Sequence, residues 1–299
     1  MKFATINFLK FMLCILLYGV VYMFVMAFMP FSQAFTEISR QISETQTLAS
    51  TLLMLLPIIW NCFASYFIVR HANIGGKKLI IHLLCVMFFA VIFVPQALGA
   101  ESADVHGVSW YDFMLITIPG FVSLLAMIPL MVRFFQNKNM VEEVGKRKKR
   151  GAKDTAIKIG LGGLIVAGAY ILFLLAVQRH FEEYRIFYAD TVWMQAAHGE
   201  NIVGIFYPLF SIPFLRGVIY GLFALPLLTI ITKSKFIFTT AICLVVLAPV
   251  AAFVAPNPLF PDTVRFLLMA SMTITMLLLG IFIGNVMWEK QGLNEYDTE

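Results

Sequence analysis

The stretch FLKFMLCILLYGVVYMFVMAFM, residues 8–29, indicates the fold class of this 299-residue chain. It contains a single charged residue, Lys10, and is long enough for a helix that crosses the roughly 30 Å hydrocarbon core of a bilayer. It is also longer than the apolar region of a secretory signal, so we expect it to be retained. Working outward, we expect spans at 8–29, 48–69, 79–99, 112–135, 157–177, 217–232, 236–254 and 264–288. The sequence therefore predicts an all-α, polytopic transmembrane helical bundle of eight spans.

The composition agrees with this class. Hydrophobic residues make up 60% of the chain and charged residues 13%, against roughly 45–50% and about 25% in soluble domains. A soluble core cannot bury that excess, so we expect the lipid bilayer to surround the chain. The net charge of +5 is explained by basic cytoplasmic loops, and we expect no nucleic-acid partner. The four cysteines show no metal-binding spacing, and we expect no metal and no cofactor.

Lys and Arg residues orient the predicted spans, because cytoplasmic loops of membrane proteins carry an excess of them. With the N-terminus inside, all but five of the 22 Lys and Arg residues fall on the cytoplasmic side. The five on the outer side are Arg40, Arg179, Arg185, Arg216 and Arg265. We therefore predict that both termini are cytoplasmic and that the chain is a multi-pass protein of a bacterial inner membrane.

A basic loop, 136–158, divides the chain into a first half, 1–135, and a second half, 159–299, each with four predicted spans. In both halves a long outer connection follows the first span, and a proline lies late in the third span, at Pro95 and Pro249. An even number of spans would make the two halves a parallel repeat about an axis along the membrane normal. We therefore predict a possible 4+4 repeat.

Two connections carry further expectations. The segment 179–215 is amphipathic in its first part, and we expect its last part, 202–215, to be re-entrant or interfacial because Pro208 and Pro213 disfavour a continuous helix. The loop 136–158 contains five consecutive basic residues, each able to attract anionic lipid by about 1 kcal/mol. The predicted anionic-lipid residues are Lys146, Arg147, Lys148, Lys149 and Arg150.

Polar side chains near the membrane midplane carry no charge, which argues against a proton relay or a path for a charged substrate. Asn61 is the most informative, because an amide in a span needs a hydrogen-bond partner, either another helix or a substrate in a cavity. The candidate substrate-binding residues in the membrane are Asn61, Ser65 and Tyr66. At the outer face we add Arg216 and Arg265, whose guanidinium groups can bind carboxylate or phosphate.

Small residues recur at a spacing that lets helix backbones approach closely in lipid. The predicted packing positions are Gly160, Gly163, Gly217, Gly221, Gly280 and Gly284. We therefore expect close helix pairs that involve the fifth, sixth and eighth spans.

Recognised catalytic motifs are absent from the sequence: it has no Walker A loop, Rossmann fingerprint, GxSxG or HExxH. Glu182, Glu183 and Arg185 resemble part of the EExxxR signature of intramembrane CAAX-type proteases, but the spacing here is EEYR and no catalytic role is transferred. The leading hypothesis is a permease or transport component for a neutral, amphiphilic or lipid-like compound. The alternatives are a membrane sensor or accessory subunit that docks a partner through 179–198, and an outer-facing membrane enzyme centred on His180, Glu182 and Glu183.

Overall fold

A computed structural model describes residues 2–45, 52–53, 55–95, 109–137, 151–188, 210–232, 234–254 and 261–288, and these residues form helices and their connections without any strand. The elements are α1 (Lys2–Met26), α2 (Gln33–Thr45), α4 (Leu56–Arg70), α5 (Gly76–Val86), the π-helix η1 (Met87–Phe93), α8 (Trp110–Phe135), α9 (Ala152–His180), α10 (Glu182–Tyr188), α13 (Ile212–Ile230), α14 (Lys235–Leu247), the 3-10 helix η5 (Ala248–Phe253) and α15 (Asp262–Val286).

Six helices among the described residues are long and apolar enough to cross a membrane. They cover Thr5–Met26, Gly76–Phe93, Met114–Phe135, Ala152–Val177, Ile212–Ile230 and Asp262–Val286. Two shorter apolar helices, Leu56–Arg70 and Lys235–Ala251, lie where the sequence predicts the second and seventh spans. The chain is therefore a polytopic α-helical membrane protein.

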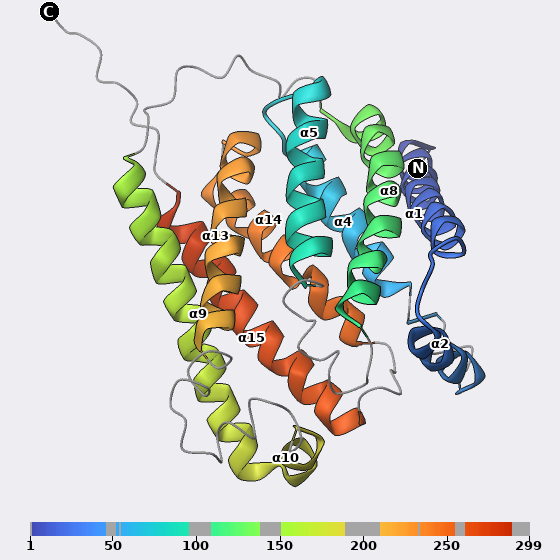
Figure 1. Cartoon of the computed structure of the whole chain (residues 1–299). Helices are drawn as coiled ribbons and strands as arrows, with labels where there is room; N and C mark the ends of the chain where they lie inside the picture. The colour runs from blue at the N-terminus through green and yellow to red at the C-terminus, as the bar shows by residue number, and fades with distance from the viewer. Residues whose placement is uncertain are drawn as a thin grey trace, which may run out of the picture.

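The helices of each half pack against one another (Figure 1). In the first half, α8 packs along α1 and also contacts α4, α5 and η1. In the second half, α15 packs against α9, α14 and η5, while α13 packs along α9. The halves meet where α4 contacts α14 and η5, and where α5 contacts α13. One buried apolar core extends across all of these helices, so the halves do not form separate cores.

The two ends of the bundle differ in charge. In Figure 1, α1 and α5 begin at the upper end, and we call this the basic end. The basic end is defined by Arg70, Lys77, Lys78, Arg133 and Lys235. Helices α2 and α10 lie at the lower end, which we call the opposite end. At the opposite end Tyr184 of α10 is buried against α9 and α15 in a small cluster with Leu174, Val177 and Val264.

Local sequence explains where several helices begin. Ser109 caps α8 by accepting a hydrogen bond from the Asp112 N–H, and the Asp112 carboxylate in turn accepts from the Ser109 hydroxyl. Gly76 opens α5 with a φ of 58°, a conformation that residues with a Cβ rarely adopt.

Helix α13 begins at Ile212, so residues 212–215 join this helix, whereas we expected the segment 202–215 to be separate. Pro213 fits there because the first helical turn lacks intrahelical partners for its N–H groups; residues 202–209 lie outside the described residues.

The third apolar helix of each half changes its hydrogen-bonding pattern along its length. In the first half α5 continues as η1, and in the second half α14 continues as η5. In the second half the cause can be followed atom by atom. Pro249 has no N–H, and the Ala248 N–H bonds to the Val245 carbonyl instead of the Leu244 carbonyl that an α-helix would use. The Leu244 carbonyl accepts a 2.8 Å hydrogen bond from the Trp60 indole N–H of α4. A side chain from the first half therefore satisfies the backbone group that the change of helix type leaves free.

Candidate membrane-embedded site

Asn61 and Ser65 form the most unusual polar pair in the described part of the chain. They lie four residues apart on α4, so their side chains share one face of the helix. Asn61 is 7% exposed and Ser65 is fully buried, and neither the Asn61 Oδ1 nor the Ser65 Oγ has a hydrogen-bond partner among the described residues. A buried polar atom without a partner costs about 1–3 kcal/mol. The pair is therefore suited to a ligand or water that supplies the missing hydrogen bonds.

Two tyrosines of α1 extend this polar region. The Tyr18 hydroxyl lies close enough to the Asn61 side chain to interact with it electrostatically. Tyr22 stacks on Tyr18 with ring centroids 6.4 Å apart. Asn61 thus lies near Tyr18, which is one of a stacked pair of aromatic rings, an arrangement suited to a compound with a polar group and an apolar body.

Tyr66, which was predicted beside Asn61 and Ser65, takes part in a different set of contacts. Its ring meets Phe135 of α8 at 4.9 Å between centroids and Phe11 of α1 at 5.6 Å, both edge to face. Such aromatic pairs each contribute about 0.5–1.5 kcal/mol beyond area burial. Tyr66 therefore helps to hold α1, α4 and α8 together.

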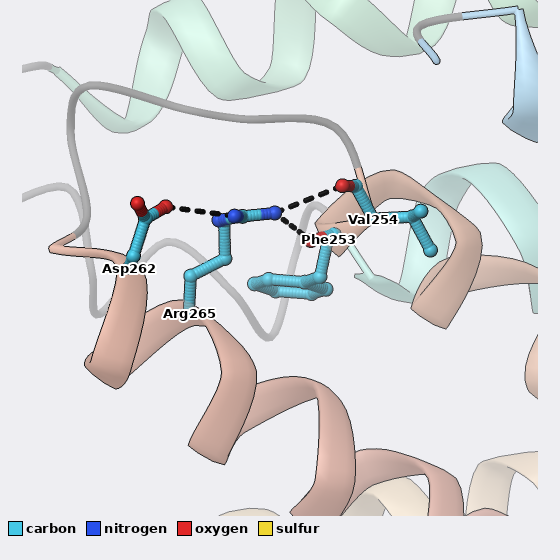
Figure 2. Close-up of polar contacts among 4 residues, drawn as sticks. All are labelled: Phe253, Val254, Asp262 and Arg265. Carbon is cyan, nitrogen blue, oxygen red and sulfur yellow. Dashed lines mark hydrogen bonds and ion pairs between the residues drawn. The ribbon is translucent and has the colours of Figure 1, made fainter. Parts of the chain in front are cut away.

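Arg265 lies near the start of α15, at the opposite end, and is almost fully buried. Its Nη1 donates to the carbonyls of Phe253 at 3.0 Å and Val254 at 2.8 Å, and its Nη2 donates to the Asp262 carboxylate at 2.7 Å (Figure 2). These carbonyls end the η5 segment, and a guanidinium there also complements the negative end of the helix dipole. Arg265 thus connects the end of η5 to the start of α15.

The other predicted arginine, Arg216, lies half-buried one turn before Tyr220 on α13, and its charge acts on that tyrosine. Besides its three hydrogen bonds, the Arg265 guanidinium lies 4.7 Å from the centroid of the Phe266 ring, and its Nε is buried without a described partner. Arg265 is therefore already engaged within the chain, while Arg216 lies on a different helix.

No family model matches this chain, and no curated protein or solved structure matches it. Its function must therefore be argued from the residues themselves.

Sequence reasoning passed over two polar residues that the structure makes prominent. Asp112 is buried and accepts hydrogen bonds from the Ser32 N–H at 2.8 Å, the Ser32 hydroxyl at 2.6 Å and the Ser109 hydroxyl at 2.9 Å. Asn73, in the short connection between α4 and α5, bonds to the end of α13. The capping pattern Ser-x-x-Asp could have indicated part of the first site, but the partner of Asn73 is 159 residues away in the chain.

The predicted glycine positions differ in how closely another helix approaches them. A Cβ on Gly217 would lie 2.8 Å from the Gly163 Cα, and one on Gly163 would lie 2.9 Å from the Phe214 carbonyl oxygen. Close neighbours are also found for Gly221 with Ile159, Gly280 with Cys243 and Gly284 with Thr239. Gly160 faces open space, since a Cβ there would meet nothing within 4 Å.

Two further predicted regions contribute no site in the described residues. The basic residues 146–150 lie outside them, as do residues 189–198 of the predicted docking segment 179–198. His180, Glu182, Glu183 and Arg185 are exposed, and the described residues include no group of three His, Cys, Asp or Glu side chains placed to hold a metal. In α10, Tyr184 turns inward onto its own chain, so that part of the amphipathic surface is already covered.

Proposed function

We propose that this chain is a permease, or the membrane component of a transport system, for a neutral amphiphilic or lipid-like compound. The observation that carries the proposal is the pair of buried, unpartnered polar atoms on Asn61 and Ser65. Polar groups inside a membrane protein are expensive, and groups left without partners point to function. Asn61 Oδ1 accepts a hydrogen bond from a hydroxyl or amide of the substrate, and Tyr18 and Tyr22 contact its apolar part.

The helix contacts support a parallel repeat in which α4, the helix that carries this site, lies at the interface between the halves. If the halves correspond, α4 matches α13, and α5 with η1 matches α14 with η5. The contact of α4 with α14 and η5 is then equivalent to the contact of α13 with α5 and η1. The contact of α1 with α8 likewise matches that of α9 with α15. Transporters built from repeats bind substrate at the repeat interface, between interrupted helices, and α4 is one of the helices at this interface.

The proposed orientation places the basic end in the cytoplasm, in a bacterial inner membrane. All eight apolar helices then cross the bilayer, both termini are cytoplasmic, and the residues 146–150 contact anionic lipid. The two shorter helices, α4 and α14, are accommodated because α14 continues directly into η5 and because local thinning of the bilayer costs only fractions of a kcal/mol per Å.

The proposal is tested with NBD-labelled phosphatidylcholine, a net-neutral amphiphile, in liposomes that contain the purified protein. Dithionite quenches only label that reaches the outer leaflet, so the quenched fraction reports movement of the lipid. We expect the protein to accelerate this movement and Asn61→Leu to slow it several-fold. Acceleration that is the same for wild type and Asn61→Leu would remove the role assigned to Asn61.

Ser65→Ala has a matched control in Ser123→Ala. Both serines are fully buried in apolar helices, but the Ser123 hydroxyl donates to the Pro119 carbonyl of its own helix at 2.7 Å, whereas Ser65 Oγ has no described partner. We expect Ser65→Ala to slow lipid movement while the melting temperature stays the same or rises, because no hydrogen bond within the chain is lost. Ser123→Ala should leave the rate of movement unchanged.

A further inference from the structure

Asn73 joins the two halves at the basic end. It lies in the connection 71–75 between α4 and α5 and is 2% exposed. Its backbone N–H donates to the Ile230 carbonyl at 2.8 Å, and its side-chain Oδ1 accepts from the Thr232 N–H at 2.9 Å. Both backbone groups lie where α13 ends and where an intrahelical partner is no longer available. One residue of the first half therefore caps the end of a helix of the second half.

A second amide holds the same connection to its own half. The Gln136 Nε2, at the end of α8, donates to the Ile74 carbonyl at 3.1 Å, and its Oε1 accepts from the Gly76 N–H at 3.4 Å. The connection 71–75 is thus attached to α8 through Gln136 and to α13 through Asn73. Of the two amides, Asn73 crosses between the halves and Gln136 does not.

The polar contacts described at the opposite end have a different pattern. Asp112 bonds to Ser32 and Ser109, all within the first half. Arg265 bonds to Asp262 and to the end of η5, all within the second half. These contacts lie within each half, whereas the Asn73 bonds at the basic end, like the Trp60–Leu244 bond between α4 and α14, join the two halves.

We propose that Asn73 is a clasp that closes the basic end of the interface between the halves, and that the structure is the state closed at that end. The proposal rests on the proposed transport function, since it assigns a gate to the path that passes Asn61. The halves separate at the basic end when the Asn73 bonds break, and the path then opens on that side. Two neutral hydrogen bonds shift such an equilibrium by roughly tenfold or more, which is reversible within a transport cycle.

The experiment measures the distance between nitroxide labels on Lys77→Cys of α5 and Lys235→Cys of α14. Both side chains are exposed at the basic end, one in each half. The four native cysteines are first replaced, and double electron–electron resonance is recorded on the protein in nanodiscs. Asn73→Ala removes the Thr232 bond and keeps the backbone bond, so we expect the longer-distance population to grow roughly five-fold, as loss of about 1 kcal/mol predicts.

Two variants make the result specific. Gln136→Ala also removes a side-chain amide with two backbone partners from the same connection, but it acts within one half, so the distance distribution should not change. Asn73→Asp keeps an acceptor for the Thr232 N–H and should keep the closed distribution. An unchanged distribution in Asn73→Ala, or an equal change in Gln136→Ala, overturns the clasp.

A second measurement separates this proposal from the transport proposal. Asn73→Cys and Thr232→Cys are joined by a short bifunctional thiol reagent, and movement of NBD-labelled phosphatidylcholine is measured before and after joining. We expect joining to stop the movement that the unjoined variant supports. Full movement after joining overturns the clasp and leaves the transport proposal intact. If no variant moves the lipid, the transport proposal fails for this probe, and the resonance distances still decide whether Asn73 holds the halves closed.

Discussion

At the scale of single residues, the buried polar groups of this chain differ in whether the chain itself satisfies them. Asp112 is satisfied: it lies just before the apolar span Met114–Phe135 and accepts hydrogen bonds from Ser32 and Ser109. Burial alone would raise the pKa of the Asp112 carboxyl, but the hydrogen bonds from both serines outweigh it and lower the pKa below its usual value. The ionised carboxylate therefore anchors the connection that follows α1 to the start of α8.

This lowered pKa predicts a pH-dependent contribution to stability. The unfolded carboxyl titrates near pH 3.9 and the folded one lower, so its stabilisation is complete above about pH 5 and is lost as pH falls through the folded pKa. We expect Asp112→Asn to be less stable than wild type at pH 7 by about 1.5–3 kcal/mol. The melting temperatures of the two proteins should converge below about pH 4. A difference that stays constant from pH 7 to pH 3 would contradict the assignment.

At the scale of helices, the change from α14 to η5 shows how a side chain of one half satisfies a backbone carbonyl of the other. Pro249 lacks an N–H, and the Ala248 N–H donates to the Val245 carbonyl. The Trp60 indole N–H donates to the Leu244 carbonyl, which would otherwise have no partner. At the far end of η5, the Arg265 guanidinium donates hydrogen bonds to the carbonyls of Phe253 and Val254. The segment is thus held at both ends by side chains, and its stability depends on neighbouring helices.

A double-mutant cycle tests this dependence. Trp60→Phe removes the indole donor and leaves the buried Leu244 carbonyl unpaired, so we expect a loss of about 1–3 kcal/mol, measured as a lower melting temperature. Pro249→Ala restores an N–H at position 249, which can bond to Val245 and lets Ala248 return to Leu244. Trp60→Phe should therefore destabilise the Pro249→Ala protein less than the wild type. Additive effects would argue against this exchange of partners.

Helix α9 offers a matched pair of glycines for the packing prediction. A Cβ on Gly163 would meet the Phe214 backbone, so we expect Gly163→Ala to destabilise the protein by about 1–3 kcal/mol. Gly160→Ala places its methyl in open space and gains helix propensity, so the melting temperature should stay the same or rise. Thermal unfolding in one detergent compares the two variants. Equal destabilisation by both would show that close approach is not what distinguishes them.

At the scale of the whole molecule, the arrangement places basic residues at one end and two connecting helices, α2 and α10, at the other (Figure 1). Both connecting helices follow the first long helix of a half. This distribution is what a cytoplasmic basic end requires, because Lys and Arg favour the cytoplasmic side.

Reporter fusions test the orientation and the number of spans together. We expect alkaline phosphatase fused after residue 45 to be active, since it is exported, and the same enzyme fused after residue 75 to be inactive, since it stays in the cytoplasm. These two points flank α4, whose described part is shorter than the helices that meet the length expected of a span. The points 210 and 254 flank α13 and α14 and should both be external. Equal activity at 45 and 75 would show that α4 does not cross the membrane.

The sequence by itself determined that the chain is an α-helical membrane protein and where its apolar helices lie. Hydrophobicity and helix length depend on neighbouring residues in the chain, and these can be read without knowing what a helix touches. It also singled out Asn61, because an amide is unusual in a span whatever surrounds it. The boundary at Ile212 was missed because the effect of a proline depends on its place in the helix, and Pro213 falls in the first turn.

Only the tertiary structure decided which polar groups find partners. Among the described residues, Asn61, Ser65 and Arg265 each keep one buried atom without a partner. The Nη atoms of Arg265 donate to the end of η5 and to Asp262, and Asn73 bonds to Thr232 across the halves. It also separated Gly163 and Gly217, which touch another helix, from Gly160, which does not. The physical reason is that a hydrogen bond or a close backbone contact needs a second group, and that group lies on a helix far away in the sequence.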